Sequence, residues 1–235
     1  MSELCKWLHE QLERMPQITF PFKPKELPEN GIYFFYEKSE YWGHGGSKPR
    51  IVRIGTHKDG NFRRRIAEHF LLDDRKMDFD SNRPAPHERS IFRKNIGRAL
   101  LGREKDAYLS VWELDFTSKA GKQRFSSLRN IDKEKQLETQ ITQILRETFS
   151  FRYVMIEGQE RRMGTKGLEA ALIGTVAGCG LCRPSAGWLG NHSPKAKVAQ
   201  SGLWLAQHLK ASPIDENDRI AIEEAVLRIS LIAGL

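Results

Sequence analysis

The sequence predicts an α/β fold of the α+β type, in which a strand hairpin lies beside amphipathic helices. Residues 31–36 form an aromatic and β-branched run directly after the turn signal Pro28-Glu29-Asn30, a pattern typical of a strand. Residues 50–56 alternate basic and β-branched residues up to a glycine, which predicts a paired strand with one buried face. Apolar stripes at helical spacing supply the helices.

The N-terminal half contains two predicted helices. Residues 3–14 carry leucines and a tryptophan at helical spacing, which indicates a short amphipathic helix. Residues 60–72 follow a turn and have Asn61 as an expected cap. The buried stripe of this second helix consists of Phe62, Ile66 and Phe70. Arg65 and His69 are four residues apart, so they share an adjacent helical face.

The chain after residue 72 combines a long loop with further helices and strands. The polar segment 73–86 contains several breakers and predicts a surface loop. Alternating apolar residues predict strands over 108–115 and 151–156. Helical periodicity predicts helices over residues 87–101, 133–149, 168–176 and about 216–232.

Length and composition favour a single catalytic domain with additions. The chain has 235 residues, 39% of them hydrophobic, which is enough for one sizeable core. No apolar run approaches the roughly 18 residues that a membrane-spanning helix needs, and the first residues are too polar for a signal peptide. Three cysteines do not form a disulfide framework. We therefore expect a cytoplasmic protein without membrane contact.

The positive charge is concentrated in one region. The net charge is +8, and between His44 and Lys105 there are 16 Lys or Arg against 8 Asp or Glu. The same region holds four of the seven histidines. This distribution favours a phosphate-backbone partner, DNA or RNA, although a solubilising surface would produce the same excess. Basic residues expected to contact such a substrate are Arg53, His57, Arg63, Arg89 and Arg93.

Gly31-Ile32-Tyr33 and Arg53-Ile54-Gly55, followed by Arg65 and His69 on one helix, together resemble the split signature of the GIY-YIG endonucleases. The resemblance covers roughly residues 30–191, and it is greatest to bacterial relatives that write the second half as Arg-Ile-Gly-Thr-His. It implies a small three-stranded antiparallel sheet flanked by helices. The expected organisation is a nuclease-like domain over 30–195, a helical extension over 1–29 and another over 196–235.

The resemblance also implies site residues. The family's first tyrosine corresponds to Tyr33, its helix arginine to Arg65, its metal-binding glutamate to Glu169 and its late asparagine best to Asn191. His69 stands one turn after the arginine, where relatives have tyrosine or histidine. The implied activity is cleavage of a DNA phosphodiester with one divalent cation, Mg²⁺ or Mn²⁺.

Phosphodiester chemistry requires the same kinds of residue independently of the family. A nucleophilic water must lose a proton, and negative charge must be neutralised on phosphoryl oxygens. Arg65 offers a planar fork for those oxygens. Glu169 is a hard oxygen ligand suited to Mg²⁺. Tyr33 and His69 are the candidates for proton transfer.

One departure leaves a second function open. Arg53 occupies the position of the family's second tyrosine, so proton transfer would depend on Tyr33, His69 or His57. A nucleic-acid-binding module that keeps the fold without activity is therefore the alternative. A third hypothesis is a docking or homodimer surface on the last helix, made of Ile220, Val226, Ile229 and Ile232.

Cys179 and Cys182 form a C-x-x-C motif. The motif is typical of half a zinc site or of a redox pair. Zinc requires two further ligands, and His192 is the only histidine nearby in the sequence. The sequence alone therefore favours a glycine-rich turn with reduced thiols.

Overall fold

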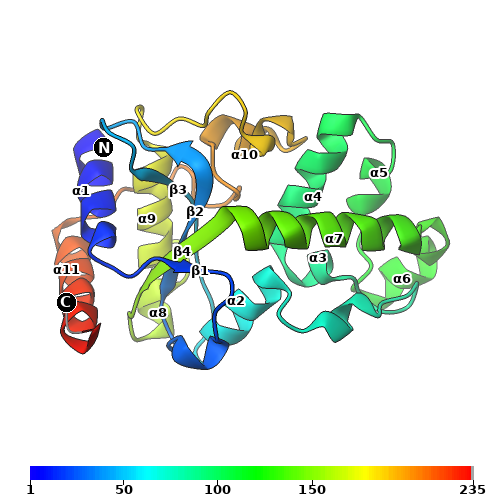
Figure 1. Cartoon of the computed structure of the whole chain (residues 1–235), viewed down its shortest axis with the longest axis horizontal. Helices are drawn as coiled ribbons and strands as arrows, with labels where there is room; N and C mark the ends of the chain where they lie inside the picture. The colour runs from blue at the N-terminus through cyan, green and yellow to red at the C-terminus, as the bar shows by residue number, and fades with distance from the viewer. Residues whose placement is uncertain (234–235) are drawn as a thin grey trace.

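The computed structural model describes the backbone of residues 1–233 and the side chains of residues 1–228. The chain folds into one sheet with helices on both faces (Figure 1). The strands are β1 (Ile18–Thr19), β2 (Ile32–Tyr41), β3 (Pro49–Thr56) and β4 (Phe149–Val154). The α-helices are α1 (Ser2–Glu13), α2 (Phe62–Phe70), α3 (Pro86–Arg89), α4 (Ile91–Glu104), α5 (Leu109–Trp112), α6 (Lys119–Phe125), α7 (Ile131–Thr148), α8 (Gln159–Arg162), α9 (Leu168–Ala177), α10 (Ala196–Ser201) and α11 (Glu216–Ala233). Short 3-10 turns are η1 (Pro24–Glu26), η2 (Asp74–Met77), η3 (Ser126–Leu128) and η4 (Leu189–His192).

The sheet is antiparallel and has the strand order β1-β4-β2-β3. Strand β2 is central, so Tyr33 has Gly55 opposite it on β3 and Tyr153 opposite it on β4. The three expected strands 31–36, 50–56 and 151–156 are confirmed. The fourth strand, β1, contains only Ile18 and Thr19 and pairs with β4, which is too short for a periodic signal in the sequence.

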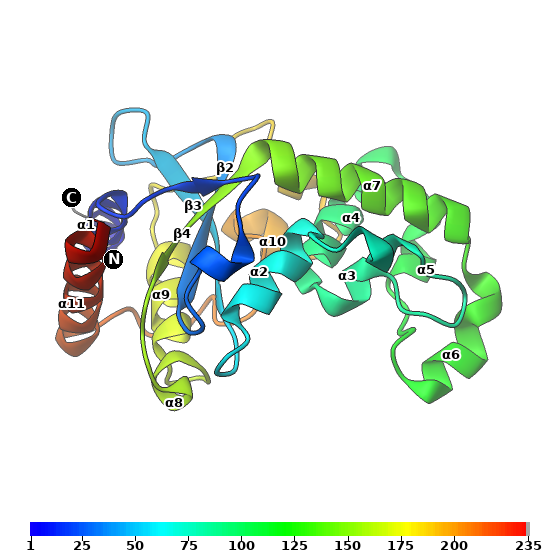
Figure 2. The ribbon, with the colours of Figure 1, turned by 60° about the horizontal axis from the view of Figure 1, so that its bottom comes forward.

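The two faces of the sheet bury two hydrophobic clusters. Ile32, Phe34 and Tyr36 pack with residues of α1, α9 and α11. Tyr33 and Phe35 point to the opposite face and pack with α2, α4 and α7. Figure 2 shows α7 extending over α3 and α4 toward the sheet, where the chain continues directly into β4. The alternation along β2 therefore sends Tyr33 toward the basic helices.

Two predictions for the segment after α2 were wrong. Residues 108–115 form no strand and instead contain the short helix α5 (Leu109–Trp112). Trp112 explains the difference, because its ring stacks on His87 at 3.7 Å and lies against Gly97 of α4. The predicted helix 87–101 is divided at Ser90, whose side chain accepts a hydrogen bond from the Arg93 N–H and caps α4.

The other predicted helices are confirmed with small shifts of their ends. Asn61 occupies the N-cap position of α2, but its side chain makes no capping hydrogen bond and instead donates to the Asp59 carbonyl. The polar segment 73–86 is a loop that contains only the short turn η2. Local sequence therefore determined where the helices lie better than it determined how their ends are capped.

The terminal helices belong to the same core as the sheet. Leu8 and Leu12 of α1 and Ile222 and Val226 of α11 lie in one cluster with β2. Of the docking surface hypothesised on the last helix, Val226 is buried and Ile220 is exposed; the side chains of Ile229 and Ile232 lie outside the described residues. No described helix is both long and apolar enough to cross a membrane.

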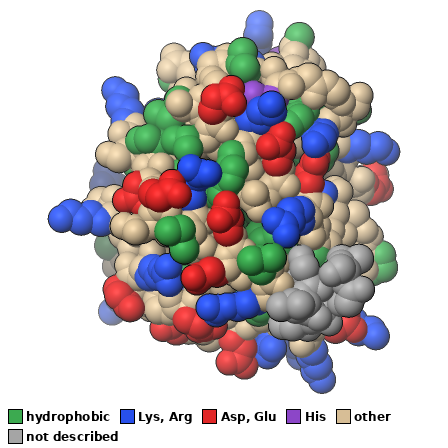
Figure 3. Space-filling model, turned by 90° about the vertical axis from the view of Figure 1, so that its left-hand side faces the viewer, with side chains coloured by type: hydrophobic (Ala, Val, Ile, Leu, Met, Phe, Trp, Pro, Cys, Tyr) green, Lys and Arg blue, Asp and Glu red, His purple; other side chains and the backbone are tan. Residues whose placement is uncertain are grey.

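The face built from α1 and α11 carries side chains of both charges. Figure 3 shows Lys and Arg interspersed with Asp and Glu, with hydrophobic side chains between them. Such a mixture gives no extended positive field for a phosphate backbone. The region of interest for a nucleic acid is therefore elsewhere on the molecule.

Candidate active site

Tyr33 and His69 form a buried hydrogen-bonded pair. Tyr33 lies on β2, and its Oη is 3.1 Å from Nε2 of His69 in the last turn of α2. The other ring nitrogen, Nδ1, is 2.8 Å from Oγ of Ser90. Tyr33 is 1% exposed and His69 is 0% exposed. The imidazole is therefore fixed from both sides, and bulk water does not reach it.

The protonation of His69 follows from this burial. Desolvation lowers the pKa of His69 well below its ordinary value, and the charges of Arg65, Arg53 and Arg93 lower it further. The ring is consequently neutral near pH 7, with one nitrogen able to donate and the other able to accept. A neutral imidazole next to a phenol hydroxyl can take the phenol proton.

Gly55 is required by the position of Tyr33. A Cβ atom at residue 55 would lie 2.3 Å from Oη of Tyr33 and within 2.7 Å of two ring carbons. The glycine of the second half-signature therefore makes room for the tyrosine of the first half. This contact explains why the two tripeptides lie opposite each other in the sheet.

Glu169 approaches the same part of the sheet from the other side. It lies in the first turn of α9, and its Oε1 accepts a hydrogen bond of 3.1 Å from the backbone N–H of Thr56. Burial raises the pKa of Glu169, while the Thr56 N–H and the charges of Arg53 and His208 lower it. No cation in the described part of the chain forms an ion pair with this carboxylate.

Glu169 lines a cavity of about 330 Å³ at the outer edge of β3. The cavity is also lined by α4, α9 and the segment 205–208, and its polar lining consists of Arg53, Asn95, Arg98, Lys195, Gln207 and His208. Four of these side chains carry or can carry positive charge, and the acidic one is Glu169. Arg98 and Lys195 are already paired with Glu113. The Arg53 guanidinium and the His208 imidazole remain for an anionic ligand, beside a carboxylate that suits a divalent cation.

Arg53 is held firmly beside this cavity. Its Nη1 donates to the carbonyl of Trp204, and its guanidinium lies 4.9 Å from the centroid of the Phe92 ring. Its Nε has no hydrogen-bond partner in the described part of the chain. The guanidinium that replaces the family's second tyrosine thus connects β3 to the segment covering its edge.

Three basic residues lie on or close to α2, the helix that carries His69: Arg65, His57 and Arg63. Arg65 is mostly buried, and its Nη1 donates to the carbonyl of Arg89 at 2.5 Å and to Glu68 at 3.3 Å. Burial and the charge of Arg65 lower the pKa of His57. Arg63 is more exposed and is bound to the Leu27 carbonyl and to Glu29.

The structure corrects the view of the second basic helix as a phosphate-contacting surface. Arg93 is fully buried, and its guanidinium binds Glu138 at 2.5 Å and the carbonyl of His69 at 3.0 Å. Every Arg93 nitrogen is used inside the protein, so in this conformation it does not reach a substrate. Arg89, at the end of α3, is exposed and remains available.

Asn191 lies outside the cavity. Its side-chain amide is exposed and donates to the carbonyls of Ser185 and Ala186. Asn95 of α4 instead lines the cavity, donates to the Trp204 carbonyl and accepts from Arg98. Sequence reasoning missed Asn95 because α4 carries no motif that separates a site asparagine from a surface one.

A comparison with models of protein families identifies the family of this chain. The sequence profile described as a GIY-YIG domain matches residues 3–230. The chain therefore belongs to the GIY-YIG family, which points to a nuclease. No curated protein and no solved structure gave a significant match.

Proposed function

We propose that this protein is an endonuclease that hydrolyses DNA phosphodiester bonds with a divalent cation. The observation that carries the proposal is Glu169, a largely buried carboxylate without a cationic partner in the described chain, in a cavity lined by arginine, lysine and histidine. Membership of the GIY-YIG family supports the reaction class. The expected site of action is the bacterial cytoplasm.

Glu169 is the proposed ligand of Mg²⁺ or Mn²⁺. One of its oxygens is held by Thr56, so the carboxylate has a fixed orientation and a second oxygen for a cation. A single carboxylate is compatible with Mg²⁺, which keeps several waters and also binds substrate phosphate. A bound cation would neutralise charge on the phosphoryl oxygens.

Tyr33 and His69 are the proposed proton-transfer pair. When Nδ1–H of His69 donates to Ser90, its Nε2 is free to accept the proton of the Tyr33 hydroxyl. The pair is buried, which keeps its mutual orientation fixed before substrate binds. Arg65, the adjacent partly exposed guanidinium, is the proposed contact to the phosphate undergoing cleavage.

Further phosphate contacts are proposed at the rim. The candidates are Arg53, His57, Arg63 and Arg89, and Asn191 would act only from outside the cavity. Phosphate contacts release counterions, so binding is expected to weaken steeply with salt. Arg93 is not part of this set, because its charge is used by Glu138.

The experiment compares Glu169→Gln with a matched control on supercoiled plasmid DNA. Glu160 is an exposed acid on α8 that does not line the cavity, so Glu160→Gln makes the same chemical change away from the site. With Mg²⁺ or Mn²⁺ we expect wild type and Glu160→Gln to nick the plasmid, and Glu169→Gln to lose at least about 100-fold in rate. All three should bind DNA similarly.

A second candidate is a nucleic-acid-binding module without activity. It is favoured by the fixed Arg53 in place of a tyrosine and by the burial of Tyr33 and His69. Wild type that binds DNA in a salt-dependent manner but never cuts it with any divalent cation would establish this candidate.

For an active nuclease, parallel assays on single-stranded RNA, with sequencing of the product ends, would define the substrate.

A further inference from the structure

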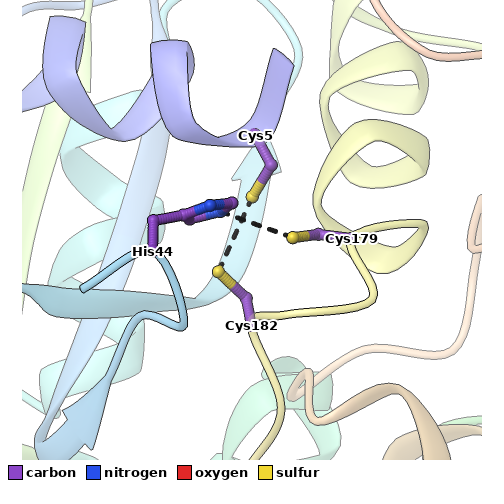
Figure 4. A group of neighbouring side chains, drawn as sticks. All are labelled: Cys5, His44, Cys179 and Cys182. Atoms are coloured by element: carbon purple, nitrogen blue, oxygen red, sulfur yellow. Dashed lines mark hydrogen bonds between the residues drawn. The ribbon is translucent and has the colours of Figure 1, made fainter. Parts of the chain in front are cut away.

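Four metal-binding side chains converge at the far end of α9 from Glu169. Cys5 comes from α1, His44 from the loop between β2 and β3, Cys179 from just beyond α9, and Cys182 from the following loop. Their ligand atoms all lie within 4.8 Å of one another. Figure 4 shows the four side chains pointing toward a common centre from three separate parts of the fold.

We propose that Cys5, His44, Cys179 and Cys182 bind one structural Zn²⁺ ion. Tetrahedral zinc with Zn–S of ~2.3 Å and Zn–N of ~2.05 Å separates two sulfurs by about 3.8 Å, and a sulfur from a nitrogen by about 3.6 Å. In the structure Cys5 Sγ and Cys182 Sγ are 3.8 Å apart, and Cys179 Sγ and His44 Nε2 are 3.5 Å apart. These two separations match those expected around a single tetrahedral ion.

Neither a disulfide nor ordinary core packing accounts for the convergence of the three thiols. All three cysteines are free and buried, and a disulfide would require a sulfur separation of about 2.05 Å. Isolated buried cysteines commonly act as small hydrophobic residues, but that role does not explain three sulfurs gathered around an imidazole nitrogen. Soft thiolates with one imidazole in tetrahedral geometry select zinc.

The nearby His9 is not a ligand. Its Nδ1 is 2.8 Å from the carbonyl of Cys5, and its Nε2 accepts a 3.2 Å hydrogen bond from the backbone N–H of Ile51. Both ring nitrogens are therefore occupied by the backbone. His9 instead connects the turn of α1 that carries Cys5 to strand β3, which fixes that ligand in place.

The loop that carries His44 packs closely against the loop that carries Cys179 and Cys182. Gly43 lies so close to Leu181 that a Cβ atom would be 1.9 Å from the Leu181 carbonyl oxygen. The His44 ring packs against Trp42 at 5.2 Å, and the Trp42 Nε1–H donates to the Gly45 carbonyl. The hairpin loop and the C-x-x-C loop are therefore in direct backbone contact.

The proposed ion has four protein ligands and no open position, which is typical of a structural zinc. It would connect the N-terminal helix, the hairpin loop and the end of α9. Since α9 has 10 residues, its zinc-bound end lies roughly 15 Å from the turn that carries Glu169. The ion would therefore hold the far end of the helix that presents Glu169, without participating in phosphodiester chemistry.

The test begins with wild-type protein that is purified without a polyhistidine tag and without chelators. Elemental analysis is expected to find about one zinc per chain, and cobalt substitution should give the visible absorption of a tetrahedral thiolate site. A chelator should lower the melting temperature, and zinc rather than magnesium should restore it. Zinc-free protein after zinc supplementation, an iron-only protein, or a native disulfide by mass spectrometry would each overturn the proposal.

Variants assign the ligands. Cys5→Ser, His44→Ala, Cys179→Ser and Cys182→Ser should each lose most of the zinc, whereas His192→Ala, the histidine closest to the motif in sequence, should retain it. Retention of full zinc by Cys5→Ser and His44→Ala would refute this ligand set. If a variant does not fold, the cobalt spectrum and zinc content of wild type still decide. Glu169→Gln should keep its zinc, so the failure of either proposal is distinguishable from that of the other.

Discussion

The hydroxyl of Tyr33 lies 3.1 Å from Nε2 of His69, on the buried side of the central strand. Ser90 is the third member of this hydrogen-bonded series, because its Oγ is 2.8 Å from Nδ1 of His69. The same oxygen accepts a hydrogen bond from the backbone N–H of Arg93 and so caps α4. The orientation of the imidazole thus depends on three elements, β2, α2 and α4. The Tyr33–His69 pair therefore connects elements of the fold and also contains the two groups proposed for proton transfer.

Replacing Tyr33 by phenylalanine removes only the hydroxyl. If Tyr33 participates in proton transfer, plasmid cleavage should slow by about 10²- to 10⁴-fold, while the free energy of unfolding falls by only about 1 kcal/mol. Tyr153→Phe is the matched control, because Tyr153 lies opposite Tyr33 on β4. A Tyr33→Phe protein that cuts at the wild-type rate would transfer the proton role to His69 or His57.

His69 should make stability depend on pH. Its pKa is lowered in the folded protein by burial and by neighbouring arginines, so as pH falls below about 6.5 the unfolded chain takes up a proton that the folded chain does not. His69 alone should then decrease the free energy of unfolding by up to about 1.4 kcal/mol per pH unit, and His9, whose pKa burial lowers to about 4, adds to the slope. Urea unfolding between pH 7.5 and 5.5 measures this slope.

The His69→Gln variant tests whether His69 causes this pH dependence of stability. Its slope over the same pH range should be smaller than that of wild type, whatever its absolute stability. His192→Gln changes an exposed histidine of η4 and should keep the wild-type slope. An unchanged slope in His69→Gln would show that another group causes the pH dependence.

Gly55→Ala should damage the site through close contact. The added methyl would lie 2.3 Å from the Tyr33 hydroxyl, so the ring must move away from His69. We expect a loss of about 1–3 kcal/mol in stability, together with slower cleavage. Gly187→Ala adds a methyl where no atom lies within 4 Å, and its thermal melting should match wild type.

Arg93→Ala should destabilise the fold more than it affects DNA contact. Although burial opposes ionisation, the Arg93 charge and the His87 hydrogen bond hold the pKa of Glu138 at about 2. Removing the arginine leaves a buried carboxylate with only His87 as its remaining partner among the described residues, and breaking such a buried ion pair costs about 3–5 kcal/mol. The exposed Arg64, paired with Glu68, is the control, and its alanine variant should lose less than about 1 kcal/mol in urea unfolding.

The sequence predicted the elements of the fold where periodicity was long enough. Helix α7 and strands β2 and β3 follow directly from their apolar patterns. Segment 108–115 was mispredicted because its alternation was short and the packing of Trp112 on His87 determined its conformation. The brief strand β1 exists only through its pairing with β4, so no local pattern encodes it.

The candidate site was predictable only in part, because its partners are distant in sequence. Tyr33 and His69 were each identified, but Ser90, which holds the imidazole, was not. Counting charge located the basic region without revealing that Arg93 is neutralised by Glu138, 45 residues away. The partners of the C-x-x-C motif lie 135 residues from Cys179 and 177 from Cys182, beyond any spacing rule.

Strand β3 is the long outer strand of the sheet, and its free side is already in use. The Val52 carbonyl accepts the Trp204 N–H at 2.8 Å, and the Thr56 N–H is taken by Glu169. An unprotected edge can recruit a strand from a neighbouring chain and start aggregation. The backbone at Trp204 and the side chain of Glu169 therefore also cover this edge, so substitutions of Glu169 should be screened for self-association before any loss of function is interpreted.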